Sequence, residues 1–248
     1  LSALGSFVND MYAPALPSMA RLFGCSVSTA QMGLTMGMIG LALGQLILGP
    51  VSDRVGRKPV LVGSMAVFIV AAVISVFSPT IHFFLGCRVF QGIGAAGAYF
   101  LARTIPADLY GGRALAKLMA IVGAINGLAP AASPVIGGII TDAWSWKGVF
   151  WVLAAFALVL IALSPLSRES LPKDRRFKGP WSRELGRYLV LLRNKPFMVH
   201  VTLKGAALGL LFAYISSSSF IVQTVYGFSA TGYGLIIGGN ALFCAAGS

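Results

Sequence analysis

The stretch GPVSDRVGRKP, residues 49–59, decides the fold of this chain. It places charged side chains, glycine and proline between two strongly apolar runs, residues 31–49 and 60–77. Each run is long enough to cross a bilayer as a helix. We interpret residues 49–59 as a tight turn that makes the two helices antiparallel neighbours. Its three cations, Arg54, Arg57 and Lys58, predict that this turn lies on the cytoplasmic side.

The composition is that of an integral membrane protein. The chain is 57% hydrophobic and 10% charged, whereas a soluble globular chain carries about 25% charged residues. The net charge of +12 is compatible in principle with a nucleic-acid partner. We exclude that partner because the cations lie between apolar runs, where they set membrane topology.

Eight apolar segments follow one another along the chain. They span residues 1–17, 31–49, 60–77, 81–102, 118–140, 149–163, 197–220 and 231–246. Residues 164–196 are polar, basic and interrupted by four prolines, which predicts a linker. The chain begins without methionine inside the first segment and ends inside the last, so we expect it to be part of a longer protein.

The distribution of lysine and arginine predicts the orientation. Fifteen of these residues fall in loops on the same side as residues 49–59, whereas the opposite loops carry only Arg21 and Lys147. By the positive-inside rule, the N-terminus and the linker are cytoplasmic. Lys204 falls within a segment and is predicted to extend to the inner surface.

The sequence contains no pattern that indicates an enzyme, a metal site or a cofactor. The three cysteines Cys25, Cys87 and Cys244 are far apart and have no CxxC spacing. The two histidines, His82 and His200, are isolated. GxSxG, HExxH and Walker motifs are absent from the sequence. An intramembrane enzyme or a non-transporting sensor therefore has no motif in its favour.

The pattern Gly-x3-Asp-Arg-x-Gly-Arg-Lys resembles the loop between helices 2 and 3 of the major facilitator superfamily. The resemblance implies an all-α polytopic fold with about eight of twelve transmembrane helices present. Residues 1–163 would form the N-terminal six-helix bundle, 164–196 a cytoplasmic basic linker, and 197–248 the start of the C-terminal bundle. The implied gating residues, which hold the outward-open state, are Gly49, Asp53, Arg54, Gly56, Arg57, Lys58 and Asp108.

Within this loop region, specific charge pairs are expected. Asp53 is able to cap a helix or pair with an arginine, and Arg57 is able to pair with Asp108 at the inner end of segment 81–102. Such pairs would form a two-state latch. The alternative is that these charges act only in topology.

Asp10 is the candidate proton carrier. A carboxylate in a membrane helix is costly and is usually retained where it faces a cavity or a partner. The alternative is a solvated position near the outer helix end. The run Asp-Met-Tyr-x-Pro-Ala-Leu-Pro, residues 10–17, resembles the first helix of drug/proton antiporters of the Bcr/CflA (bicyclomycin/chloramphenicol resistance) type. The resemblance extends the site to Tyr12. Some members carry a second carboxylate near the position of Ser2, which this chain lacks.

Arg88 and Gln91 lie in Arg-x-x-Gln-Gly-x-Gly, which resembles the fourth-helix motif of the superfamily. Arginine stays protonated in proteins, so Arg88 would supply a fixed positive charge that modulates a neighbouring carboxylate. The alternative is that Arg88 extends to the outer surface. The sequence leaves open whether Asp10 and Arg88 are in contact.

Small residues predict where helices approach closely. Pro130, Pro134, Gly137 and Gly138 resemble the fifth-helix motif of antiporters, although Ser133 replaces the usual glycine before the proline. Proline bends a helix and glycine allows close approach. A stripe of glycines on segment 31–49 predicts a second packing surface: Gly33, Gly37, Gly40 and Gly44.

These observations predict proton-coupled efflux of small drugs or metabolites by alternating access, driven by the proton gradient without a cofactor. A metabolite importer or symporter of the same fold is the alternative. The expected partners are a small-molecule substrate, protons and the lipid bilayer, with no nucleic acid, and the protein is expected to be a monomer. Its expected location is the bacterial cytoplasmic (inner) membrane. The substrate cannot be named from the sequence.

Overall fold

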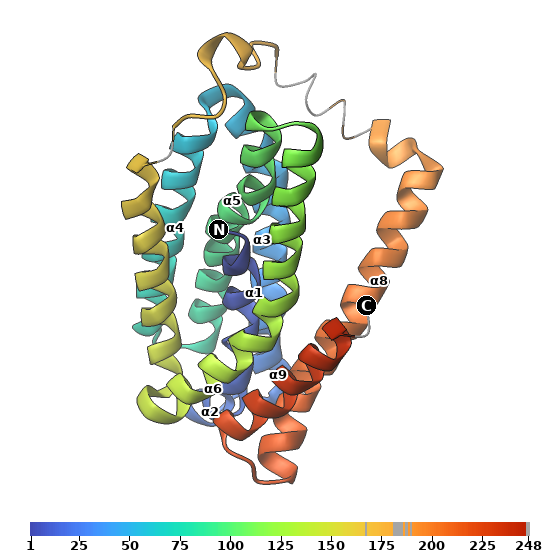
Figure 1. The fold of residues 1–248 in the computed structure, drawn as a ribbon. Helices are drawn as coiled ribbons and strands as arrows, with labels where there is room; N and C mark the ends of the chain where they lie inside the picture. The colour runs from blue at the N-terminus through green and yellow to red at the C-terminus, as the bar shows by residue number, and fades with distance from the viewer. Residues whose placement is uncertain (167, 181–185, 187, 189, 247–248) are drawn as a thin grey trace.

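The fold was analysed in a computed structural model that describes residues 1–166, 168–180, 186, 188 and 190–246, excluding the side chains of 244–246. The described residues form helices and short connections, with no strand among them. The long helices run side by side in an elongated bundle (Figure 1). Residues 167, 181–185, 187 and 189 of the predicted linker lie outside the described part, as does the side chain of Cys244.

The first predicted segment is a broken helix. It consists of α1 (Ser2–Asp10), a single turn η1 (Ala13–Ala15) and α2 (Leu16–Phe23), so it continues beyond the predicted end at residue 17. Pro14 and Pro17 stand in the first turns of η1 and α2. Because proline lacks an N–H group and clashes with the preceding turn, the helix is interrupted just after Asp10.

The turn that was predicted at residues 49–59 is much shorter in the structure. Helix α3 (Val27–Val55) continues through Pro50, and α4 (Arg57–Val76) begins two residues after α3 ends. Only Gly56 separates them, with φ 114° and ψ 161°. A residue with a Cβ atom is strained at this φ, so a glycine is needed to reverse the chain here. Gly49 therefore lies inside a helix, not in the turn.

Five helices of the described chain are long and apolar enough to cross a membrane. After α5 (Ile81–Leu109), helix α6 (Gly112–Leu163) contains two predicted segments joined at a break at Ser145, where φ is 64°. Two single turns, η2 (Ser164–Leu166) and η3 (Lys173–Arg175), lie in the linker. Helix α8 (Lys195–Phe220) ends in a π-turn, η4 (Ile221–Val225), and α9 (Ala230–Ala246) follows. The eight predicted apolar segments are thus helical where described.

The glycine stripe on α3 is a packing surface, as predicted. Gly33, Gly37, Gly40 and Gly44 are all buried. A Cβ atom on Gly40 would collide with the backbone of Val89 on α5, and one on Gly44 would lie 2.8 Å from the Cα of Ile93. Backbone-to-backbone contact at this distance allows α3 and α5 to pack more closely than larger residues permit.

Helices α8 and α9 contact the first six segments unevenly. The hydrogen bonds of α8 to the first segments come from its last turns: Ser219 Oγ donates to the Ala13 carbonyl (2.7 Å), and the Ser216 carbonyl accepts from Gln31 Nε2 (3.2 Å). Towards Lys195, α8 diverges from the bundle (Figure 1). The predicted second bundle stays a prediction, because the described chain contains only α8 and α9 beyond the linker.

Replacing Gly40 by valine is expected to destabilise the protein by about 1–3 kcal/mol, because the new side chain has to displace the α5 backbone. Thermal unfolding of the purified full-length protein in detergent measures the change. Gly63→Val is the matched control, since a Cβ atom at Gly63 on α4 meets nothing within 4 Å. Equal melting temperatures of the two variants would contradict the packing role.

Candidate functional site

Asp10 is buried at the end of α1, directly before the helix break. The alternative of a solvated carboxylate is therefore wrong. Its carboxyl group lies beside the Ser133 hydroxyl of α6, at the position where the family motif has glycine. It also lines the central cavity, a space of about 750 Å³ bounded by α1, α3, α5, α6 and α8. Other residues that line this cavity include Gln45, Arg103, Pro130, Lys204 and Phe212.

Arg88 is fully buried in the middle of the packed helices and does not extend to the surface. Its guanidinium donates to Gln91 Oε1 (2.5 Å), the Gly33 carbonyl (3.1 Å), the Val8 carbonyl (3.1 Å) and Asn9 Oδ1 (2.9 Å). These acceptors come from α1, α3 and α5. Among the described residues, Arg88 forms no ion pair, either with Asp10 or with another carboxylate.

Tyr12 and Gln91 surround Arg88. The Arg88 guanidinium carbon lies 4.7 Å from the centre of the Tyr12 ring. Gln91 Nε2 is buried and has no hydrogen-bond partner in the described part of the chain. Neither residue lines the central cavity, so the structure joins them to Arg88 rather than to Asp10. Their part in proton coupling or substrate binding stays a prediction.

The predicted charge pairs at the α3–α4 turn are confirmed. Arg57 Nη1 is bonded to Asp53 Oδ1, and Arg57 Nε donates to Asp108 Oδ2 of α5 (2.9 Å). Arg57 Nη1 also donates to Ser52 Oγ (2.6 Å). This charge cluster (Asp53, Arg57 and Asp108) is formed although α8 diverges from the bundle at the same end. Its pairing alone therefore does not close the central cavity.

Part of the linker, residues 168–180, lies across this turn, and we refer to it as the strap. Glu169 accepts the backbone N–H groups of Arg57 (2.8 Å) and Lys58 (3.2 Å), which are the first residues of α4. Arg54 Nη2 donates to the Gly179 carbonyl (2.7 Å). Glu169 is one of three acids in the basic linker, with Asp174 and Glu184, and no motif distinguishes it from the other two.

The proline–glycine motif of α6 forms the contact with α1 and α9. Gly137 lies against the Met11 backbone at the helix break. A Cβ atom on Gly138 would lie 2.8 Å from the Cα of Thr231 in α9. Pro130 borders the central cavity. The motif thus places α9 next to the break that carries Asp10, and its role in antiport stays a prediction.

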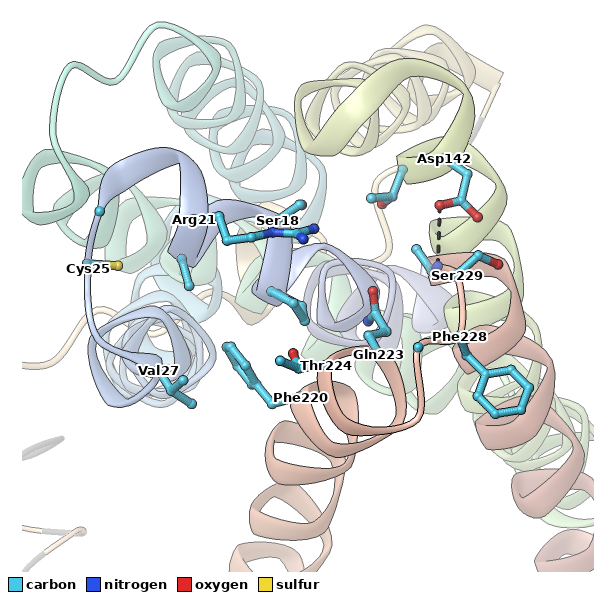
Figure 2. A pocket seen from close by; sticks show the side chains of 16 residues that line it. Ser18, Arg21, Cys25, Val27, Asp142, Phe220, Gln223, Thr224, Phe228 and Ser229 are labelled. Atoms are coloured by element: carbon cyan, nitrogen blue, oxygen red, sulfur yellow. Dashed lines mark hydrogen bonds between the residues drawn. The ribbon is translucent and has the colours of Figure 1, made fainter.

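A second carboxylate cap, which sequence reasoning missed, joins α6 to α9. Asp142 accepts the backbone N–H groups of Ala230 (3.3 Å) and Thr231 (2.8 Å) at the start of α9. Figure 2 shows Asp142 beside Ser229, on the opposite side of a pocket from Arg21. Nearby, Gln223 Nε2 donates to the Pro14 carbonyl (2.9 Å). The end of the bundle far from the linker is therefore closed by polar contacts between segments distant in sequence.

Arg88→Lys is expected to lower stability by about 1–3 kcal/mol for each buried acceptor left unpaired, because one ammonium group cannot serve acceptors on three helices. The melting temperature of the purified full-length protein measures this loss. Arg113→Lys, on the exposed start of α6, provides the control. If Arg88→Lys and the control have the same melting temperature, the hydrogen bonds of Arg88 contribute little to the stability of the protein.

Glu169→Ala is expected to release the strap. Removing a helix cap costs about 1 kcal/mol. This loss corresponds to about a fivefold larger population of molecules in which the strap is detached from α4. Limited trypsin digestion should then cleave faster after Lys173 and Arg175, two exposed residues of the strap. Asp142→Ala is the control, since Asp142 caps a helix at the far end of the bundle and leaves the sequence of the strap unchanged. Unchanged cleavage after Glu169→Ala would refute the capping role.

Comparisons with known proteins agree with the fold and the motifs. The chain is 32% identical to an uncharacterised MFS-type transporter, YdgK, of Bacillus subtilis, over 100% of this chain and 62% of that protein. It is 31% identical to a chloramphenicol resistance protein of Pseudomonas aeruginosa, over 94% of this chain and 55% of the relative. The chain thus spans little more than half the length of these curated relatives.

Among solved structures, the chain is similar to a bacterial homologue of the human lysosomal transporter Spinster. The TM-score is 0.75 at 19% identity, and the match covers 100% of this chain and 59% of the other. The sequence model of the Major Facilitator Superfamily matches residues 1–248. This chain belongs to the Major Facilitator Superfamily, and the part that the structure describes has the long apolar helices of a multi-pass membrane protein.

Proposed function

We propose that this protein is a proton-coupled exporter of small drugs or metabolites, of the Bcr/CflA drug/proton antiporter type. The observation that supports this most strongly is Asp10, a buried carboxylate that also lines the central cavity. Ionisable groups inside a membrane segment commonly belong to ion or proton pathways. The Pseudomonas aeruginosa relative is named for resistance to chloramphenicol, which fits export of a drug.

In this proposal Asp10 binds the proton and Arg88 acts on it indirectly. Arg88 holds the side chain of Asn9, the residue before Asp10. Arg88 Nη2 also donates to the Val8 carbonyl, so the guanidinium fixes the end of α1 that carries Asp10 and acts on the carboxyl group through the position of this helix. The Ser133 hydroxyl lies beside Asp10 and donates its proton to the Ala129 carbonyl (2.7 Å), so its oxygen is able to accept a hydrogen bond from the protonated carboxyl group.

Alternating access requires two ends that open in turn. In the structure, α8 diverges from the bundle at the linker end, while Asp142 and Gln223 join the segments at the other end. If the linker is cytoplasmic, as the distribution of cations predicts, this arrangement opens the central cavity to the cytoplasm. Export then proceeds by breaking the Asp142 contacts while the linker end closes.

The proposed setting is the cytoplasmic membrane of a bacterium, with the N-terminus inside and the protein acting as a monomer. The proton gradient supplies the energy, so no cofactor is required. Proton release from Asp10 to the cytoplasm would precede substrate binding, and proton uptake from outside would follow substrate release.

The test is efflux of labelled chloramphenicol from cells expressing the full-length protein, with and without a protonophore. Wild-type efflux should be protonophore-sensitive, and Asp10→Asn should reduce it to the level of cells lacking the gene. Asp10→Glu, which keeps a titratable group, should retain part of the activity. Asp174→Asn is the control, because it removes an exposed carboxylate from the linker.

Two results would overturn the proposal. Protonophore-sensitive efflux that persists in Asp10→Asn would remove Asp10 from the coupling mechanism. Gradient-driven uptake in place of efflux would identify a symporter of the same fold.

A further inference from the structure

Lys204 lies on the face of α8 that borders the central cavity. Lys204, Leu208, Leu211 and Ile215 recur at i, i+4, i+7 and i+11, which places them on one face of a helix, and all four line this cavity. Lys204 is nine residues beyond the start of α8 at Lys195, which corresponds to about 13 Å along the helix axis. The prediction that Lys204 simply extends to the inner surface is therefore incomplete, because its side chain borders the same space as Asp10.

The charged groups that line this cavity include more cations than anions. They are Asp10 from α1, Arg103 from α5 and Lys204 from α8, and the residues lining it from α3 and α6 are uncharged. Arg103 donates to Tyr99 Oη (3.2 Å) and stacks on the same ring, with its guanidinium carbon 4.5 Å from the ring centre. The cavity wall of the described chain thus carries two cations and one carboxylate.

Lys204 has no carboxylate partner within this wall. In the part of the chain that the structure describes, the ion pairs involve only Arg57 and Arg176 as cations. Lys204 and Arg103 are both exposed, so their charged groups are accessible to a molecule that enters the cavity. A bound molecule with an anionic group would supply that partner, whereas a cationic molecule would be repelled by Lys204 and Arg103.

The remainder of the cavity wall favours an apolar body on the same molecule. Met38 and Leu41 of α3 face Leu208, Leu211 and Phe212 of α8 across the cavity. Pockets for small molecules are typically apolar with a few placed polar groups that fix orientation. The charged groups here are Asp10, Arg103 and Lys204, and the uncharged polar residues of the wall are Ser6, Asn9, Gln45 and Tyr99.

We propose that Lys204 is a substrate-recognition residue and that the transported molecules include small amphipathic organic anions, which it favours over neutral and cationic analogues, an inference that rests on the proposed exporter function. Lys204 binds the anionic group of the substrate, and the apolar residues of α3 and α8 enclose its hydrocarbon part. Arg103 attracts the same charge from α5. Asp10 is left free to carry the proton, so substrate and proton bind to different side chains.

The experiment uses three coumarins that carry a carboxylate, a carboxamide or an aminoethyl group at the same ring position. The experiment uses inside-out membrane vesicles that contain the full-length protein and whose interior is more acidic than the medium. The uptake of each compound into these vesicles is measured. The wild type should prefer the carboxylate. Lys204→Gln should raise the KM for the carboxylate compound about tenfold, as expected for a lost charge-assisted hydrogen bond. The kcat for the carboxylate compound and the transport of the carboxamide compound should be nearly unchanged.

Two further variants separate recognition from a structural role. Lys204→Arg should keep the carboxylate preference, because the positive charge is retained. Lys195→Gln removes a charge from the exposed start of the same helix and should have no effect. Equal loss of carboxylate and carboxamide transport in Lys204→Gln, or preference of the wild type for the aminoethyl compound, would overturn the proposal.

Direct binding distinguishes failure of this inference from failure of the exporter function. The fluorescence anisotropy of the carboxylate coumarin is titrated with purified full-length protein. Binding that weakens about tenfold in Lys204→Gln supports the inference even if no proton-driven transport occurs. Binding that is equal in wild type and Lys204→Gln contradicts the inference even if efflux of a neutral drug is observed.

Discussion

The buried guanidinium of Arg88 is the constraint on which the arrangement of the first four segments depends. A permanent charge without access to water has to be surrounded by acceptors, and its acceptors come from α1, α3 and α5. These helices must therefore approach until Val8, Asn9 and Gly33 are within hydrogen-bonding distance of one side chain. The position of α1, and with it the position of Asp10, follows from that requirement.

Glycine makes this approach possible. A Cβ atom on Gly37 would lie 2.9 Å from Arg88 Nη2 and 2.8 Å from Asn9 Oδ1, so a larger residue would occupy the space that the network needs. On the other side of α1, Gly137 of α6 lies against the Met11 backbone. The helix break caused by Pro14 and Pro17 is thus held between a polar network and a glycine contact, and Asp10 is fixed at its edge.

Much of the fold was predictable because its signals are local. The apolar segments are defined by bilayer thickness, and the Arg57–Asp108 pair followed from the resemblance of the loop to a known motif. The extent of the α3–α4 turn was not predictable, because a helix that continues through Pro50 contradicts the usual effect of proline. The bundle contacts of this helix evidently outweigh that local preference.

The residues missed by sequence reasoning share a property: their partners are distant in the chain. Glu169 contacts α4 across more than one hundred residues, and Asp142 contacts the start of α9 across 88 and 89 residues. Lys204 shares a cavity with Asp10 only because α8 borders the same space as α1 and α3. No periodicity or motif in one segment encodes such a contact, so the contacts of these three residues could not be predicted from the sequence.

The contacts that hold the fold together are more deeply buried than the contacts at the two ends of the bundle. The Arg88 network is fully buried, and breaking it would expose a charge to an apolar surrounding at a cost of about 3–5 kcal/mol. The two carboxylate caps are different, because Glu169 and Asp142 retain access to solvent. Each binds the N–H groups that begin a helix, an interaction worth about 0.5–2 kcal/mol. Water is able to replace these contacts, so the carboxylate contacts at the two ends of the bundle are weak enough to be exchanged, whereas the Arg88 network between them is not.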